Sequence, residues 1–150
     1  MAIQLPDNWQ TALNNARTEN KTPFWASVEA DGQPSIGFYG STHAHSDHEI
    51  ALWMRSTGRG FLRRIEANPK VTMMYNDPTP ETRLNLLVHG EAARVTDAAL
   101  TKRIYDESPE VERNADANME GVAVLVDIVR IIQRGEVVQS RDGDEGKKVD

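Results

Sequence analysis

The chain has 150 residues, 39% of them hydrophobic, and its 17 basic and 23 acidic side chains give a formal net charge of −6. A chain of this size forms one domain with a hydrophobic core of its own. It contains no cysteine, which excludes disulfides, thiolate metal sites and cysteine nucleophiles. The acidic balance argues against binding to nucleic acids or membrane surfaces, because both are anionic.

The sequence gives no indication of a signal peptide or a membrane span. The first residues lack the basic stretch and apolar run of a signal peptide, and no segment approaches the ~20 apolar residues of a membrane span. We therefore expect a cytoplasmic protein. A single domain is expected over residues 1–140, followed by a polar tail, residues 141–150, that we expect to be disordered.

Hydrophobic periodicity predicts the helices and strands. Pro6 and Asp7 begin an amphipathic helix that ends in the polar run 18–21. From residue 23 the period becomes two, and Asp31-Gly32 makes a tight turn between the two strands of a hairpin. Later strands are expected over residues 49–55, 71–76, 83–95, 121–132 and 136–139, and later helices over residues 61–67 and 98–107.

These elements predict a mainly β fold with helical inserts, of the α+β class. Six or seven mostly antiparallel strands are expected, and a barrel is the arrangement that fits them best. A doubly wound parallel sheet fits poorly, because helices do not alternate with the strands. The strand at residues 121–132 is apolar on both faces, which is typical of a central strand packed on both sides.

A basic cluster stands out in this acidic protein. Residues 51–65 contain four arginines and no acid, namely Arg55, Arg59, Arg63 and Arg64. Ser56 and Thr57 lie in a turn before a helix, whose free N–H groups and dipole favour a phosphate. Arg59 and Arg63 are four residues apart and share a helix face. The alternative is a solvated helix whose arginines pair with surface carboxylates.

Histidines follow the small residues Gly40, Ser41 and Thr42. His43 and His45 share a strand face, and with Glu49 they resemble the first metal-binding motif of the cupins. The second cupin motif is missing, because Gly90 and Glu91 follow His89, the one histidine outside residues 43–48, where that motif requires other residues. A polar hairpin loop is the simpler interpretation.

The order of the elements resembles the FMN-binding split barrels of the pyridoxamine 5′-phosphate oxidase-like family. The resemblance runs from Pro23 to about Arg134 and rests on three motifs in order. These are Asp31-Gly32-Gln33-Pro34, Asn68-Pro69-Lys70-Val71, and Val88-His89-Gly90-Glu91-Ala92 before an Asp-capped helix. It implies a split β-barrel and a homodimer with two flavins at the interface, each phosphate being held by the turn and helix after the third strand.

The resemblance also implies binding residues. The phosphate region falls on Ser56, Thr57, Arg59 and Arg63, and Asn85 falls where the family directs an amide toward the flavin ring. Gly40, Ser41 and Thr42 would let the backbone approach that ring. Family members have Ser-Arg-Lys where this chain has Arg59-Gly60-Phe61, so the phosphate would be held by Arg55, Arg59 or Arg63.

The function implied by the resemblance is that of an FMN-dependent oxidoreductase acting on a small molecule, with no catalytic side chain assigned. The deazaflavin F420 or another flavin could replace FMN. One alternative is a non-catalytic module that binds flavin, F420 or haem. A less favoured alternative is a cupin-like metal enzyme that uses His43, His45 and Glu49.

Overall fold

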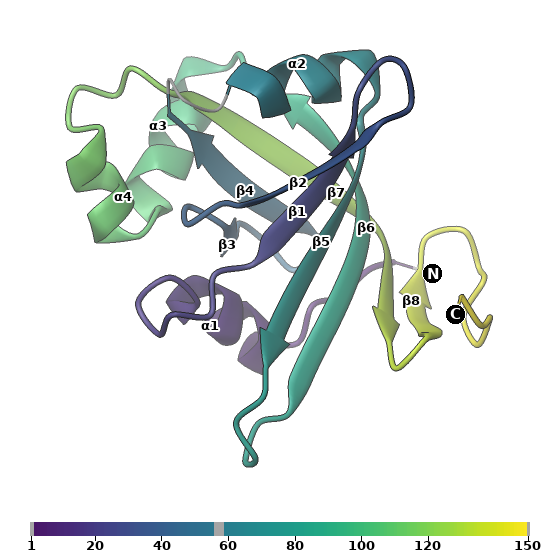
Figure 1. Ribbon diagram of the computed structural model, residues 1–150. Coiled ribbons are helices and arrows are strands. Elements are labelled where there is room, and N and C mark those ends of the chain that lie inside the picture. The colour runs from purple at the N-terminus through teal and green to yellow at the C-terminus, as the bar shows by residue number, and fades with distance from the viewer. Residues whose placement is uncertain (1, 56–58, 150) are drawn as a thin grey trace.

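The computed structural model describes residues 2–55 and 59–149 (Figure 1). The elements in chain order are α1 (Asp7–Asn15), β1 (Phe24–Val28), β2 (Pro34–Phe38), β3 (His43–Ala44), β4 (Glu49–Met54), α2 (Arg59–Ala67), β5 (Lys70–Asp77), β6 (Leu84–Arg94), α3 (Ala98–Glu107), α4 (Glu110–Ala115), β7 (Val122–Gln133) and β8 (Glu136–Ser140). No helix in these ranges is long and apolar enough to cross a membrane.

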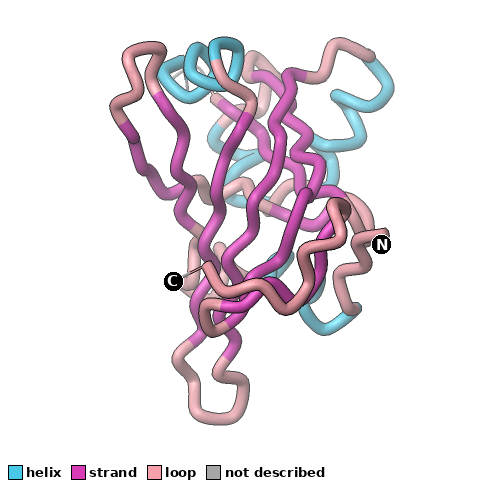
Figure 2. Tube along the Cα trace, turned by 90° about the vertical axis from the view of Figure 1, so that its right-hand side faces the viewer, coloured by secondary structure: helices cyan, strands magenta, loops and turns pink. Residues whose placement is uncertain are grey.

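All eight strands belong to one antiparallel sheet in the order β2-β1-β5-β6-β7-β4-β3. β8 pairs with the second half of β7, while β4 pairs with the first half. The sheet curls into a half-barrel, with α2 across one end and α3 and α4 beside β4 (Figure 1). Figure 2 shows the strands side by side, with helices at one end and behind them. The predicted split β-barrel of the α+β class is confirmed.

The core explains why β4 and β7 are apolar on both faces. Inside the barrel, side chains from α1 and from strands β1, β4, β6 and β7 pack together, among them Leu13, Trp25, Leu52, Leu86 and Ile128. On the other side of β4, a second cluster joins α3 to the sheet, and it contains Ala51, Trp53, Ile104, Tyr105 and Ala123. A strand that is buried on both faces has no solvent-exposed side, so it does not need a polar residue at every second position. Its sequence is therefore a continuous apolar run.

The predicted elements lie within a few residues of the observed ones. The predicted Asp cap of α3 is present, because the Asp97 carboxylate accepts a hydrogen bond from the Leu100 N–H at 2.8 Å. The sequence did not predict β3 or α4. β3 has only two residues, and α4 has only six and is tied down by its surroundings, since the Tyr105 hydroxyl donates to the carbonyls of Arg113 and Asp116.

Residues 141–149, the segment expected to be a polar tail, make specific contacts with the end of the sheet. Their backbone bonds to β8 and the turn before it, through Gly146 N–H to Val137 O at 2.8 Å and Val149 N–H to Gly135 O at 2.9 Å. The carboxylates of Asp142 and Asp144 lie 3.4 and 3.2 Å from Arg130 Nη2.

Gly90 sits where β6 is irregular. The pairing of β6 with β7 shifts register between His89 and Gly90. A Cβ atom at residue 90 would lie 2.5 Å from Val126 Cγ1 and 3.0 Å from the Asp127 carbonyl oxygen. The two strands can approach this closely only with glycine at the irregularity.

Replacing Gly90 with alanine should therefore destabilise the protein by about 1–3 kcal/mol, the usual cost of forcing an extra methyl group into a packed core. Glu91→Ala, at the exposed next position, is the matched control and should stay within about 0.5 kcal/mol of wild type. Urea denaturation of the three proteins measures the difference. Equal midpoints for Gly90→Ala and wild type would contradict the close packing.

Candidate functional site

A pocket of about 170 Å³ opens where β2 and β4 end. It is lined by Phe38, Tyr39, Gly40, Ser41, Trp53, Met54, Arg55 and Glu112. The strand ends supply the aromatic wall, the loop after β2 supplies backbone, and α4 supplies a carboxylate. Of the residues predicted to bind a cofactor, the pocket brings together Gly40, Ser41 and Arg55.

The small residues of the loop at 40–42 are already engaged with the rest of the fold. Ser41 Oγ accepts a hydrogen bond from Trp53 N–H and donates one to the Trp53 carbonyl, both at 2.9 Å. Thr42 Oγ1 accepts from Trp25 Nε1–H at 2.9 Å and donates to the Tyr39 carbonyl at 2.7 Å. The side chains of Ser41 and Thr42 therefore fix the position of the loop beside the pocket. Their contact with a cofactor remains a prediction.

The arginines of the basic cluster lie in different surroundings. Arg55 follows β4 with its Nε 3.6 Å from Glu112 Oε2. Arg59 begins α2, is exposed, and has no ion-pair partner within the described part of the chain. The predicted residues Ser56 and Thr57 lie outside the described residues. Arg55 and Arg59 thus flank the turn that was predicted to hold a phosphate.

Arg63 pairs with a surface carboxylate, as the alternative interpretation of the basic cluster expected. Its Nη2 donates to Glu29 Oε1 at 2.7 Å. Arg64 lies on the buried side of the helix, where its Nε donates to Ser27 Oγ at 2.7 Å. Hydrogen bonding to Arg63 holds the pKa of Glu29 below its usual value, so the carboxylate that competes for this arginine is charged.

Asn85 lies at the far end of the sheet from the arginines. Its side-chain amide donates to Asn76 Oδ1 at 3.3 Å. Ala92, seven residues along β6, bonds to Pro69 just beyond α2, so Asn85 is roughly 23 Å away at ~3.3 Å per residue. Asn76 lines a second hollow of about 310 Å³ that shares Phe38 with the first pocket. One chain therefore does not bring Asn85 to the predicted phosphate end.

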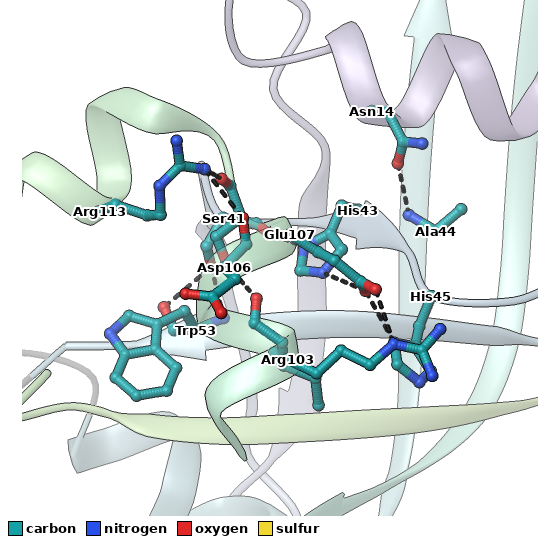
Figure 3. Close-up of polar contacts among 12 residues, drawn as sticks. Asn14, Ser41, His43, Ala44, His45, Trp53, Arg103, Asp106, Glu107 and Arg113 are labelled. Carbon is teal, nitrogen blue, oxygen red and sulfur yellow. Dashed lines mark hydrogen bonds and ion pairs between the residues drawn. The ribbon is translucent and has the colours of Figure 1, made fainter. Parts of the chain in front are cut away.

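The histidines form a polar contact with α3 (Figure 3). His45 Nδ1 lies 3.1 Å from Glu107 Oε2, and the buried His43 Nε2 lies 3.9 Å from the same oxygen. His43 Nδ1 is 2.8 Å from the Ser41 carbonyl, and burial lowers the pKa of this imidazole. A neutral His43 with its proton on Nδ1 satisfies that carbonyl.

The residues of the cupin hypothesis are not brought together. Glu49 Oε1 accepts from Ser46 Oγ at 2.9 Å and lies 3.6 Å from His48 Nε2, so it does not join His43 and His45. Within residues 2–55 and 59–149, no three His, Cys, Asp or Glu side chains are placed to hold a metal ion.

Sequence reasoning missed several residues at this site. Glu112 is buried in the pocket and contacts Arg17 from the turn after α1, with Arg17 Nε 3.3 Å from Glu112 Oε1. Asp116 accepts a hydrogen bond from Trp53 Nε1 at 2.8 Å, and Glu107 lies between the two histidines. Glu112 and Asp116 come from a segment without hydrophobic periodicity, and Glu107 is the last residue of a predicted helix, where a charged side chain is ordinary. No local pattern therefore marked these acids.

Solved structures with this fold include proteins of several kinds. An FMN-binding protein from Syntrophomonas wolfei has a TM-score of 0.59 and 15% identity, over 82% of this chain and 84% of its own. HutZ, the heme storage protein from Vibrio cholerae, has a TM-score of 0.60 and 18% identity, over 84% and 94%. An F420 reductase has a TM-score of 0.60 and 23% identity, over 85% and 98%.

The likeness to these structures establishes the fold but does not distinguish among their ligands. No curated protein is a significant sequence match to this chain. The profile of the family described as pyridoxamine 5′-phosphate oxidase, however, matches residues 6–127, which include the pocket, α2 and most of the sheet. The chain therefore belongs to the pyridoxamine 5′-phosphate oxidase family.

Proposed function

We propose that this protein binds a flavin, FMN or the deazaflavin F420, and uses it to oxidise or reduce a small molecule. The observation that carries the proposal is the meeting, in one pocket, of an aromatic strand end at Phe38 and Tyr39 with Arg55. Four residues further along the chain, the exposed Arg59 begins α2. A flat apolar ring and a phosphate are the two parts of a flavin that need such surroundings.

The residues present fit the phosphate part of this ligand. The first turn of α2 supplies free N–H groups, and Arg59 adds positive charge at the start of the helix. Phe61 stands where family members carry a lysine, and it is buried between the rings of Tyr39 and Trp25, with centroids at 4.9 and 6.5 Å. Arg59 takes over the role of that missing cation.

The ring part of the ligand needs more surface than this pocket offers. Small-molecule sites usually enclose roughly 300–1,000 Å³, and this pocket has about 170 Å³. Beside it, Ile36 and Phe38 on the edge strand β2 are 71% and 72% exposed. A second copy of the chain, packed on β2, would cover these side chains and complete the pocket.

A bound flavin would supply the redox chemistry, since it accepts and donates electrons or hydride by itself. The chain would hold the phosphate with Arg59 and the first turn of α2, place the ring beside Phe38, and exclude water through the second copy. The substrate would enter on the open face of the ring. Because Phe61 replaces a lysine, storage of a bound flavin or haem without catalysis is the second candidate.

Purified protein titrated separately with FMN, F420 and haem tests the proposal, with absorbance and flavin fluorescence as the readouts. We expect saturable binding of FMN or F420 at one ligand per chain and bleaching of the bound flavin by a reductant. Saturable binding of haem alone would favour the storage candidate, and binding of none of the three would overturn both.

Arg59→Ala should weaken FMN binding by about 1.5–3 kcal/mol, the scale of a charge-assisted hydrogen bond. Riboflavin, which lacks the phosphate, should bind the variant and wild type equally. Lys102→Ala is the matched control, because Lys102 is exposed on α3 and pairs with Asp106. If Arg59→Ala and Lys102→Ala give the same FMN titration, Arg59 does not hold the phosphate.

The second copy can be tested through the exposed apolar residues of β2. Wild type should sediment as a dimer at micromolar concentration, with an interface above ~2,000 Å² in total. Phe38→Asp should give a monomer that no longer binds flavin, because it places a charge in that interface. Val138→Asp, which makes the same change at an exposed apolar position on β8, should remain dimeric. A monomeric wild type would rule out this assembly.

A further inference from the structure

A buried carboxylate lies between two arginines at one end of the pocket. Glu112 is 7% exposed, with Oε1 3.3 Å from Arg17 Nε and Oε2 3.6 Å from Arg55 Nε. The three side chains come from the turn after α1, the end of β4 and the short helix α4. Two guanidinium groups on one carboxylate form the arrangement by which proteins recognise oxyanions in ligands.

The backbone around this carboxylate leaves no spare room. A Cβ atom on Gly40 would lie 2.4 Å from Glu112 Oε1 and 2.8 Å from Arg17 Cδ. Glycine at this position lets the loop after β2 rest directly against the ion pair. Glu112 therefore fills, from within the chain, a space whose shape and charge suit a carboxylate or phosphate group.

The charges at this end of the pocket balance. Asp116 is the second acid near Arg55. Burial raises the pKa of Asp116, but hydrogen bonds from Trp53 Nε1 and from the backbone of Glu120 and Gly121 outweigh it, and the pKa stays below its usual value. Two cations face two anions, so this end has no excess charge to attract a ligand phosphate. Removal of the Glu112 charge alone would leave an excess of one positive charge.

We propose that Arg17 and Arg55 form a second oxyanion subsite that Glu112 masks. Its ligand class is a phosphate or carboxylate group, and such a group could enter only by displacing Glu112. The native pocket therefore selects a ligand with one anionic group, held at α2, over a ligand with a second anionic group at this end. The inference deepens the proposed function, and rests on it only for the identity of the complete ligand.

Inorganic pyrophosphate, without any flavin, is the probe. Glu112→Gln keeps the shape of the side chain and removes its charge, and Glu110→Gln makes the same charge change at an exposed position of the same helix. Calorimetric titration should show pyrophosphate binding to Glu112→Gln on the order of tenfold more tightly than to wild type, as expected for removal of one like charge at a partly exposed site. Glu110→Gln should match wild type.

Adding Arg55→Gln to Glu112→Gln should abolish the gain, because the subsite then has one guanidinium instead of two. The proposal is overturned if Glu112→Gln and Glu110→Gln bind pyrophosphate equally, or if wild type already binds it as tightly as Glu112→Gln. A gain that persists in the double variant would also overturn it, since the anion would then lie elsewhere.

A second measurement remains informative even if Glu112→Gln is too unstable to titrate. Glu112→Ala leaves a space between the arginines that free acetate can fill. Acetate should raise its thermal midpoint above that in chloride at equal ionic strength, and should leave Glu110→Ala unchanged. No difference between the two salts would overturn the proposal. Because neither measurement contains flavin, a failure of flavin binding is recognised separately.

Discussion

Trp53 joins three parts of the chain that are distant in sequence, and the candidate site depends on that junction. Its backbone N–H and carbonyl both bond to Ser41 Oγ, so the loop after β2 is fixed to the middle of the sheet. Its indole N–H bonds to Asp116, and its ring packs on Tyr105 with centroids 5.0 Å apart. The pocket is therefore framed by a strand that is rigid on both faces, which is the support that a binding site needs.

The fold could be predicted because its strands and helices follow hydrophobic periods that act locally. Asp97 marked the start of α3, and the apolar run of β7 marked a strand covered on both sides. β3 escaped because two residues contain no period. The site was harder to predict, because its geometry comes from contacts such as Arg17 with Glu112, 95 residues apart. Such pairs leave no local pattern in a single sequence.

The position of Arg63 on a helix was predicted correctly, but its observed partner is a carboxylate of the same chain. The four-residue spacing predicted that Arg59 and Arg63 lie on one face of a helix, and both are on α2. The β1–β2 hairpin then brings Glu29 to Arg63, which no spacing rule along α2 could foresee. Phe61, between them in sequence, turns inward as the aromatic anchor of the helix. This helix thus divides its residues between packing against the barrel, as Phe61 does, and lying exposed on the surface, as Arg59 does.

The segment after β8 has a consequence for how molecules of this protein meet one another. Val137 uses both its N–H and its carbonyl on residues 146 and 147, on the side of β8 that faces away from β7. An uncovered strand of this kind offers unpaired backbone groups to any other extended chain. Residues 141–149 thus pair with the edge of β8 from within the same chain. Detaching them would leave the backbone groups of β8 unpaired, and a strand of another molecule could then add to that edge.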